Sequence, residues 1–266
     1  MLKPKVCVLR TAGTNCDKET AFAFVKAGAE AEFVHINQLV CAEKKLSDYQ
    51  ILALSGGFSY GDDIAAGKIL ANELKTKLSG DLNEFIRAGK LIIGICNGFQ
   101  IMVKAGLLPG NKEMKQEVSL INNDSAKFEA RWVYLSKSEK RKAQNKCVWT
   151  HNLPEVIYLP VAHGEGKFIV KDNSILERLK ENGQIVFQYC DESGKLAGYP
   201  DNPNGSTENI AGICDETGRV FGLMPHPERH VYGQQHPRWT AAKLKKEEGD
   251  GFQIFKNGVE YAKKNI

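Results

Sequence analysis

The sequence predicts an α/β fold: a mostly parallel sheet with helices on both faces and an antiparallel extension. Three observations lead to this prediction. Strand-like and helix-like segments alternate over the first hundred residues, short strand-like segments follow one another from about residue 131, and no linker rich in glycine, serine or proline separates the two halves. We therefore expect a single domain over residues 1–266, in which residues 236–266 form a C-terminal polar and helical extension.

In the first half, four apolar runs predict buried strands, at residues 6–9, 32–36, 51–54 and 91–95. Between the first two strands, Thr14, Asn15 and Asp17 offer caps for a helix that Gly28 closes. Helical stretches around residues 69–77 and 82–88 connect the third strand to the fourth. Alternation of this kind predicts parallel strands joined by helical crossovers.

After Pro109 the pattern changes to short strand candidates separated by turns. These candidates are residues 132–135, 156–159, 167–170, 185–187 and 220–224. We expect them to form the antiparallel extension of the same sheet. The last stretch is mostly polar, and we expect a helix around residues 255–263 that packs on the outside.

The composition is that of an ordinary folded protein, with 42% hydrophobic and 26% charged residues in a chain of 266. The net charge of +4 comes from scattered lysines and one denser cluster at residues 137–142. We interpret that cluster as a solvated loop rather than a nucleic-acid surface, because it includes Glu139 and lacks interleaved aromatic residues. No window offers the ~18 consecutive apolar residues of a membrane helix, and the first residues show no signal peptide. We expect a cytoplasmic protein without a membrane or nucleic-acid partner.

The seven cysteines are an odd number, and no two of them stand in a C-x-x-C spacing. They are Cys7, Cys16, Cys41, Cys96, Cys147, Cys190 and Cys214. We expect reduced, unpaired thiols that mostly fill apolar gaps, and the spacing predicts no metal site.

The stretch GICNGF places Cys96 between two glycines directly after the strand predicted at residues 91–95. A residue between a buried strand and a helix lies at the carboxyl edge of the sheet, where open α/β folds bind their ligands. Gly94 and Gly98 permit a sharp turn like that around the nucleophile of α/β hydrolases, and the N–H groups of the next helix favour a thiolate. Cys96 is therefore a candidate nucleophile, although an isolated cysteine at a strand end is more often a packed core residue.

The stretch MPHPE supplies a candidate base, His226, two residues before Glu228. The prolines on both sides of His226 exclude a regular helix and favour an extended segment, so the imidazole and the carboxylate should point to the same side. The segment follows the strand predicted at residues 220–224 and could face Cys96. A Cys-His-Glu relay would result, whereas the alternative is a proline-rich turn with a solvent-exposed histidine.

A glycine-rich stretch, GGFSYGD, follows the strand predicted at residues 51–54. Gly56 and Gly57 let backbone amides approach a ligand closely, and together with the N–H of Asn97 they suit an oxyanion hole. By itself the stretch is more typical of an ordinary glycine turn that binds nothing.

Seven phrases occur in order along nearly the whole chain: GGFSYGD, GICNGFQ, GLLPG, AHGEG, NPNGS, IAGI and PHPER. In these phrases the chain resembles class I (triad-type) glutamine amidotransferases, whose fold is flavodoxin-like, and within them the glutaminase subunits of phosphoribosylformylglycinamidine synthase. The resemblance implies that Cys96 attacks the side-chain amide of glutamine. His226 would be the general base and acid, and Glu228 would orient His226.

The same resemblance implies an oxyanion hole and a substrate pocket. The backbone amides of Gly57 and Asn97 would hold the oxyanion. Gln100 and His163 could contact glutamine, but a helix-surface amide and a polar turn residue are the alternatives for them. The residues implied to line or border the pocket are Gly56, Phe58, Gln100, His163 and Glu165.

A glutaminase of this kind requires a partner, because free ammonia at neutral pH becomes ammonium, which is no nucleophile. The resemblance implies a synthetase subunit that uses ATP and magnesium to convert formylglycinamide ribonucleotide into formylglycinamidine ribonucleotide in purine biosynthesis, and a small bridging subunit could join the two. This chain has no G-x-x-x-x-G-K-[ST] loop, and we expect no cofactor or metal in it. The loop at residues 137–149 and the tail beyond Gly233 depart from shorter family members and could serve a partner surface. Two alternatives stay open: a class I glutaminase for a different synthetase, and a non-catalytic module that senses glutamine.

Overall fold

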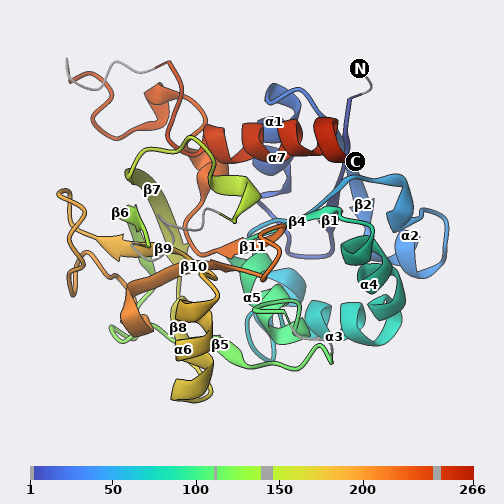
Figure 1. Cartoon of the computed structure of the whole chain (residues 1–266), viewed down its shortest axis with the longest axis horizontal. Coiled ribbons are helices and arrows are strands. Elements are labelled where there is room, and N and C mark those ends of the chain that lie inside the picture. Colours follow the sequence, from blue (N-terminus) through green and yellow to red (C-terminus); the bar gives the residue numbers. More distant parts are fainter. Residues whose placement is uncertain (1–2, 111–112, 139–145, 242–246) are drawn as a thin grey trace.

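A nine-stranded mixed sheet runs through the centre of the molecule in the computed structural model, which describes residues 3–110, 113–138, 146–241 and 247–266 (Figure 1). In order across the sheet, its strands are β2 (Glu30–His35), β1 (Lys5–Arg10), β3 (Ile51–Leu54), β4 (Leu91–Ile95), β11 (Val220–Leu223), β10 (Ile210–Cys214), β9 (Ile185–Cys190), β6 (Glu129–Lys137) and β7 (Val156–His163). A separate antiparallel pair joins β5 (Val118–Ile121) to β8 (Lys167–Val170).

The first five strands in this order are parallel. The chain places β2 on one side of β1 and then β3, β4 and β11 in turn on the other side, which is the strand order of flavodoxin-like folds. Both β3 and β4 are buried along their whole length, as expected of strands covered on both faces. Their carboxyl ends meet at one edge of the sheet. The strand predicted at residues 32–36 ends instead at His35, because that side chain caps the next helix.

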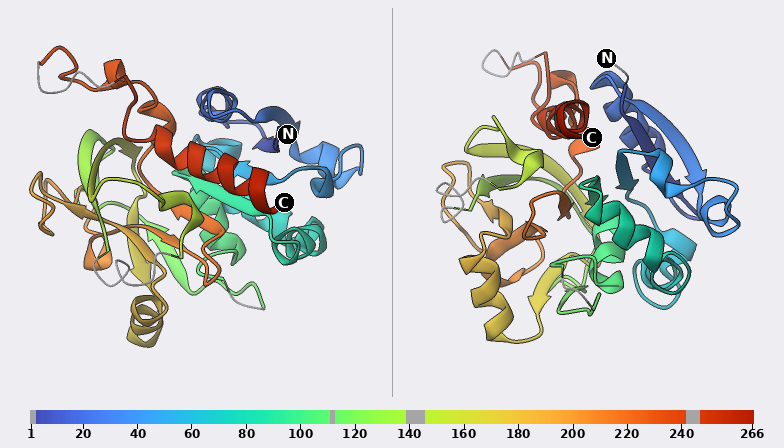
Figure 2. Two further views of the ribbon diagram at one scale, coloured as in Figure 1. Left: turned by 45° about the horizontal axis from the view of Figure 1, so that its top comes forward. Right: turned by 45° about the vertical axis from the view of Figure 1, so that its right-hand side comes forward.

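Helices cover both faces of the parallel half (Figure 1, Figure 2). On one face lie α1 (Asp17–Lys26) and α7 (Phe252–Asn265), and on the other lie α3 (Lys68–Lys77), α4 (Ser79–Arg87) and α5 (Asn97–Ala105). The helix expected near the C-terminus is confirmed but begins earlier, at Phe252, and its Phe255 packs edge-on against Phe24 of α1. Two short helices were not predicted: α2 (Ile36–Val40), which begins at the last residue of the strand predicted at residues 32–36, and α6 (Asn173–Glu181).

Two strand predictions for the second half are wrong in detail. Residues 220–224 do not belong to the antiparallel extension, because β11 pairs in parallel with β4, from Val220 opposite Ile92 to Leu223 opposite Ile95. All four residues of β11 are buried, which suits the covered centre of the sheet. Residues 167–170 leave the main sheet altogether, since β8 pairs only with β5.

The antiparallel extension is confirmed and consists of β10, β9, β6 and β7. The cluster at residues 137–142 falls mostly outside the described residues. At the end of the same loop, Trp149 is fully buried, and its Nε1–H donates to the Arg219 carbonyl over 2.9 Å. The division into one domain with an extension at residues 236–266 stays a prediction. Among the described helices, none combines the length and the apolar character that crossing a membrane would require.

Candidate active site

Cys96 occupies a sharp turn between β4 and α5. Its backbone has a φ of 52° and a ψ of −106°, a conformation that is strained for any residue with a Cβ atom and that is characteristic of nucleophiles on strand-to-helix turns. The flanking glycines make the turn possible: a Cβ atom at Gly98 would lie 1.8 Å from the Leu54 carbonyl oxygen, and one at Gly94 would lie 2.2 Å from the Met102 sulfur. Cys96 is 5% exposed at the carboxyl edge of the sheet.

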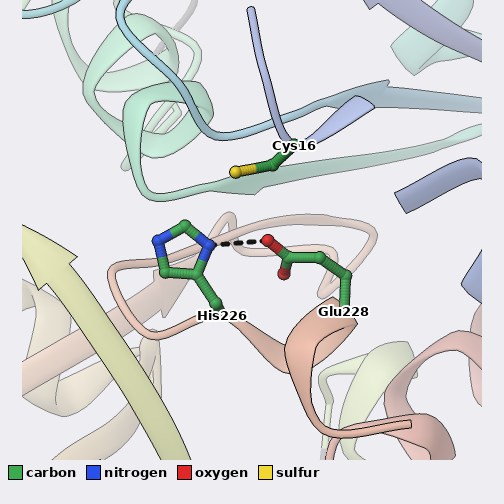
Figure 3. A group of neighbouring side chains, drawn as sticks. All are labelled: Cys16, His226 and Glu228. Carbon is green, nitrogen blue, oxygen red and sulfur yellow. Dashed lines mark hydrogen bonds and ion pairs between the residues drawn. The ribbon is translucent and has the colours of Figure 1, made fainter. Parts of the chain in front are cut away.

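His226 and Glu228 form a buried hydrogen-bonded pair (Figure 3). Nδ1 of His226 donates to Oε1 of Glu228 over 2.6 Å, and only 2% of each residue is exposed. The segment is extended at His226, as its prolines predicted, but not beyond that residue. Pro227–Arg229 forms a 3₁₀ turn that begins at Pro227, where the missing N–H group would have had no partner in any case. This turn brings the imidazole and the carboxylate together.

The His226 ring lies next to the Cys96 side chain, with Gly56 against both. A Cβ atom at Gly56 would lie 2.9 Å from Cε1 of His226 and 3.5 Å from Cβ of Cys96. Burial opposes the charged form of His226, but the Glu228 carboxylate and then the sulfurs of Cys96 and Cys16 raise its pKa well above the ordinary value. Among the described residues, Nε2 of His226 makes no hydrogen bond. It is therefore available for proton exchange at the site.

Two backbone amides beside the cysteine are unpaired. Within the described part of the chain, neither the N–H of Gly57 nor that of Asn97 donates a hydrogen bond. Gly57 has a φ of 143°, and a Cβ atom there would lie 2.7 Å from the Asn15 nitrogen, so only glycine fits. The loop after β1 holds this segment through the Cys16 N–H, which donates to the Gly56 carbonyl over 3.1 Å. Asn97 begins α5, where free N–H groups and the helix dipole favour negative charge.

Gln100 is buried in α5 and belongs to a network of hydrogen bonds, so it is not a helix-surface amide. Its Nε2 donates to the Glu165 carbonyl over 2.5 Å, and its Oε1 accepts from Nδ2 of Asn97 over 3.0 Å. Oδ1 of Asn97 in turn accepts from the Ser59 N–H over 3.2 Å. The Glu165 carboxylate lies 3.9 Å from Nζ of Lys104. The network fixes the turn after β7 and the glycine-rich loop relative to α5.

His163 is buried, and both of its ring nitrogens have partners. Nδ1 lies 3.1 Å from Oδ1 of Asn123, and Nε2 lies 3.5 Å from Nδ2 of Asn204, which fits a neutral ring with its proton on Nδ1. Burial, followed by the charge on His226, lowers the pKa of His163 to about 4. Phe58, by contrast, is 47% exposed. That these two residues contact glutamine stays a prediction.

Two neighbours of the triad, Cys16 and Arg229, lie outside the predicted site. Nη2 of Arg229 donates to Sγ of Cys16 over 3.0 Å, and the cysteine lies beside His226 (Figure 3). The predicted caps were Thr14, Asn15 and Asp17, but the N-cap residue of α1 is Cys16, whose side chain makes no capping bond. The signal that could have found Cys16 is its place just after β1, whose carboxyl end shares an edge with β3 and β4.

Comparison with known proteins covers nearly the whole chain. Residues 3–262 match the family model described as "CobB/CobQ-like glutamine amidotransferase domain". The phosphoribosylformylglycinamidine synthase subunit PurQ of Dehalococcoides mccartyi is 50% identical over 264 residues, 99% of either chain. The subunit of the same name from Methanococcus maripaludis is 48% identical over 274 residues, 98% of either chain. A chain in the structure described as "Structure of PurLQS from Thermotoga maritima" is 33% identical, with a TM-score of 0.73 over 98% of this chain and 99% of that one.

Proposed function

We propose that this chain, which belongs to the CobB/CobQ-like glutamine amidotransferase family, is the glutaminase subunit of a phosphoribosylformylglycinamidine synthase and hydrolyses glutamine through Cys96, His226 and Glu228. Two relatives that match at 50% and 48% identity over 98% or more of the chain carry that subunit name. The enzyme belongs to purine biosynthesis. These relatives favour this assignment over a glutaminase for a different synthetase.

In the first half of the reaction, the Cys96 sulfur attacks the side-chain carbonyl carbon of glutamine. His226 accepts the thiol proton at Nε2, and Glu228 holds the Nδ1 proton in place so that the ring has the tautomer that a base requires. The raised pKa of His226 favours the pair of imidazolium and thiolate over the neutral pair. The negative charge that forms on the carbonyl oxygen is stabilised by the free N–H groups of Gly57 and Asn97.

In the second half, His226 returns its proton to the leaving nitrogen, and ammonia departs from a glutamyl thioester on Cys96. Water then attacks the thioester with His226 again as the base. Glutamate leaves, and the thiol is restored. Each step moves one proton through His226, and its burial against the Glu228 carboxylate holds the ring in place for both halves of the reaction.

The ammonia should pass to a synthetase subunit rather than to solvent. A chain 33% identical to this one occurs in a structure described as PurLQS, which supports a complex of three kinds of subunit. We assign ATP and magnesium to the synthetase partner and the bridging role to the small third subunit. A cytoplasmic location, expected from the sequence, is part of the same proposal.

The observation that carries the proposal is the buried 2.6 Å contact between His226 and Glu228 beside a cysteine in a strained turn. The test is the complex reconstituted with Cys96→Ala, assayed for amidine formation from glutamine and from ammonium chloride. We expect the glutamine-dependent reaction to fall to background and the ammonia-dependent reaction to persist, whereas Cys41→Ala, a change at an exposed cysteine, should keep both. Glutamine-dependent activity in the Cys96→Ala complex would overturn the proposed nucleophile.

A further inference from the structure

Cys16, His226 and Glu228 form a buried cluster of three side chains that can bind a metal ion (Figure 3). One ligand atom of each residue lies within 4.8 Å of those of the other two. The three residues are 1%, 2% and 2% exposed. Cys96 does not belong to this group. We propose that the cluster is a zinc site, in which bound Zn²⁺ inhibits the glutaminase reaction.

The donor set suits zinc. Thiolate, imidazole and carboxylate bind Zn²⁺ at about 2.0–2.3 Å in tetrahedral geometry, which places ligand atoms about 3.4–3.6 Å apart. Figure 3 shows the Cys16 sulfur pointing to the space beside the contact between Nδ1 of His226 and Oε1 of Glu228. That contact, 2.6 Å long, must open by about 1 Å to admit the ion between its two atoms. A water molecule would complete the coordination.

A second observation points to a cation at this place. Oε2 of Glu228 is buried and makes no hydrogen bond among the described residues. A buried carboxylate oxygen without a partner is costly, and a metal ion would compensate that cost. Because Oε2 is held by no other group in the described chain, the carboxylate can turn toward an ion without breaking a second bond.

Arg229 supports the cysteine as a ligand. Its Nη2 donates to the Cys16 sulfur over 3.0 Å, and the Cys16 thiol in turn donates to Oδ1 of Asn15 over 3.1 Å. Hydrogen bonds of this kind orient the sulfur as they orient metal ligands. The ion, the thiolate and the Glu228 carboxylate together have no net charge, so the positive charge of Arg229 does not oppose binding.

Binding has a definite effect on the protons of the site. The Cys16 thiol proton goes to solvent and the Nδ1 proton of His226 is displaced, so that the neutral ring carries its one proton on Nε2, because the metal occupies Nδ1. An imidazole with its proton on Nε2 cannot accept another from Cys96, and the ring is also detached from Glu228. The inhibition therefore rests on the proposed role of His226, whereas the binding of the ion does not. The cysteine spacing predicted no metal site because only the fold brings residues 16 and 226 together.

The test uses the full-length chain and Co²⁺ as a spectroscopic substitute for Zn²⁺. Wild type, Cys96→Ala and the exposed control Cys41→Ala should each show a saturable sulfur-to-cobalt charge-transfer band with similar affinity. Cys16→Ser should lack the band. Competition with a chromogenic chelator should show that its Zn²⁺ affinity is reduced by more than about 100-fold, which is more than the loss of a residue that only hydrogen-bonds to a ligand would cause. In the glutaminase assay, zinc should inhibit the wild-type complex reversibly.

The variants separate this proposal from metal binding by the nucleophile. A band that disappears in Cys96→Ala and persists in Cys16→Ser would overturn the proposal, as would the lack of a saturable band in the wild type. Circular dichroism checks that each variant is folded, and His226→Ala supplies a second ligand variant in which zinc affinity must also fall. Because the readout is metal binding, these results do not depend on whether the chain is active as a glutaminase.

Discussion

Acid should destabilise this fold through His163, a buried histidine that is neutral in the folded chain. The ring is 2% exposed and is held between Asn123 and Asn204. Burial, followed by the charge on His226, lowers the pKa of His163 from 6.5 to about 4. In the unfolded chain the ring is free to take up a proton at about pH 6.5. The unfolded state therefore binds more protons between these two values.

The sign and size of the effect follow from this difference. The stabilisation that the neutral His163 ring gives the folded chain is fully present above pH 6.5. It falls as the pH is lowered and reaches its minimum below about pH 4. Over the whole range the free energy of unfolding should fall by about 3 kcal/mol, since each unit of pKa difference corresponds to about 1.4 kcal/mol. At pH 5 the loss should be about 2 kcal/mol.

The assay is urea unfolding at pH 7.5 and pH 5.0, followed by tryptophan fluorescence, for the wild type and His163→Gln. Glutamine has no charge at either pH, so the variant should lose less free energy between the two pH values than the wild type by about 2 kcal/mol. Comparing the two differences removes the contributions of all other titrating groups. The variant His151→Gln, at an exposed histidine, controls for the removal of a histidine as such.

Equal pH dependence in the wild type and His163→Gln would refute the reasoning. A direct measurement supports the same test if the variant is too unstable to compare. The ring protons of His163 in the wild-type protein should show no titration in nuclear magnetic resonance spectra between pH 8 and pH 5.5. A titration near pH 6.5 would mean that the ring is hydrated in the folded state.

Two further changes test the nucleophile turn and the orienting carboxylate. Gly98→Ala should lower the free energy of unfolding by about 2 kcal/mol or more, because its methyl group would lie 1.8 Å from the Leu54 carbonyl oxygen. The control Gly80→Ala, with nothing within 4 Å in α4, should raise it by about 0.5–1 kcal/mol, and a fully stable Gly98→Ala in urea unfolding would contradict the close approach. Glu228→Gln should lower kcat about 10³–10⁴-fold with little change in KM, because the amide keeps the shape but not the charge that holds the Nδ1 proton. Steady-state glutaminase kinetics of the complex measure this effect, and an unchanged kcat would rule out an orienting role for Glu228.

The sequence was sufficient to predict the site residues where a reactive residue type directly follows a predicted strand. Cys96 could be singled out because glycines flank it directly after an apolar run, and only a turn with close backbone approach requires them. The pair of His226 and Glu228 could be singled out even though the segment was expected to be extended. In the structure an extended His226 is followed by the 3₁₀ turn at Pro227–Arg229, and this combination brings the two side chains together.

Contacts over long separations could not be predicted in the same way. Arg229 and Cys16 are 213 residues apart, and the neighbours of Cys16 in the sequence are typical helix caps, so the local pattern favoured a cap. For His163, a polar turn residue and a pocket residue have the same sequence signature. Its partners Asn123 and Asn204 come from separate loops, and only their positions in space show that both ring nitrogens are engaged.

The position of β11 has the greatest consequence for the site. Neighbouring strands lie about 4.8 Å apart, so the residues that follow four adjacent parallel strands can meet through short turns. The loop of Cys16 follows β1, Gly57 follows β3, Cys96 follows β4 and His226 follows β11. If β11 had belonged to the antiparallel extension, as predicted, the segment that follows it would lie further from β4 or at the opposite edge of the sheet. A shift of β11 by one residue against β4 would turn its side chains to the other face and carry His226 away from Cys96, so this register is as necessary to the chemistry as the triad.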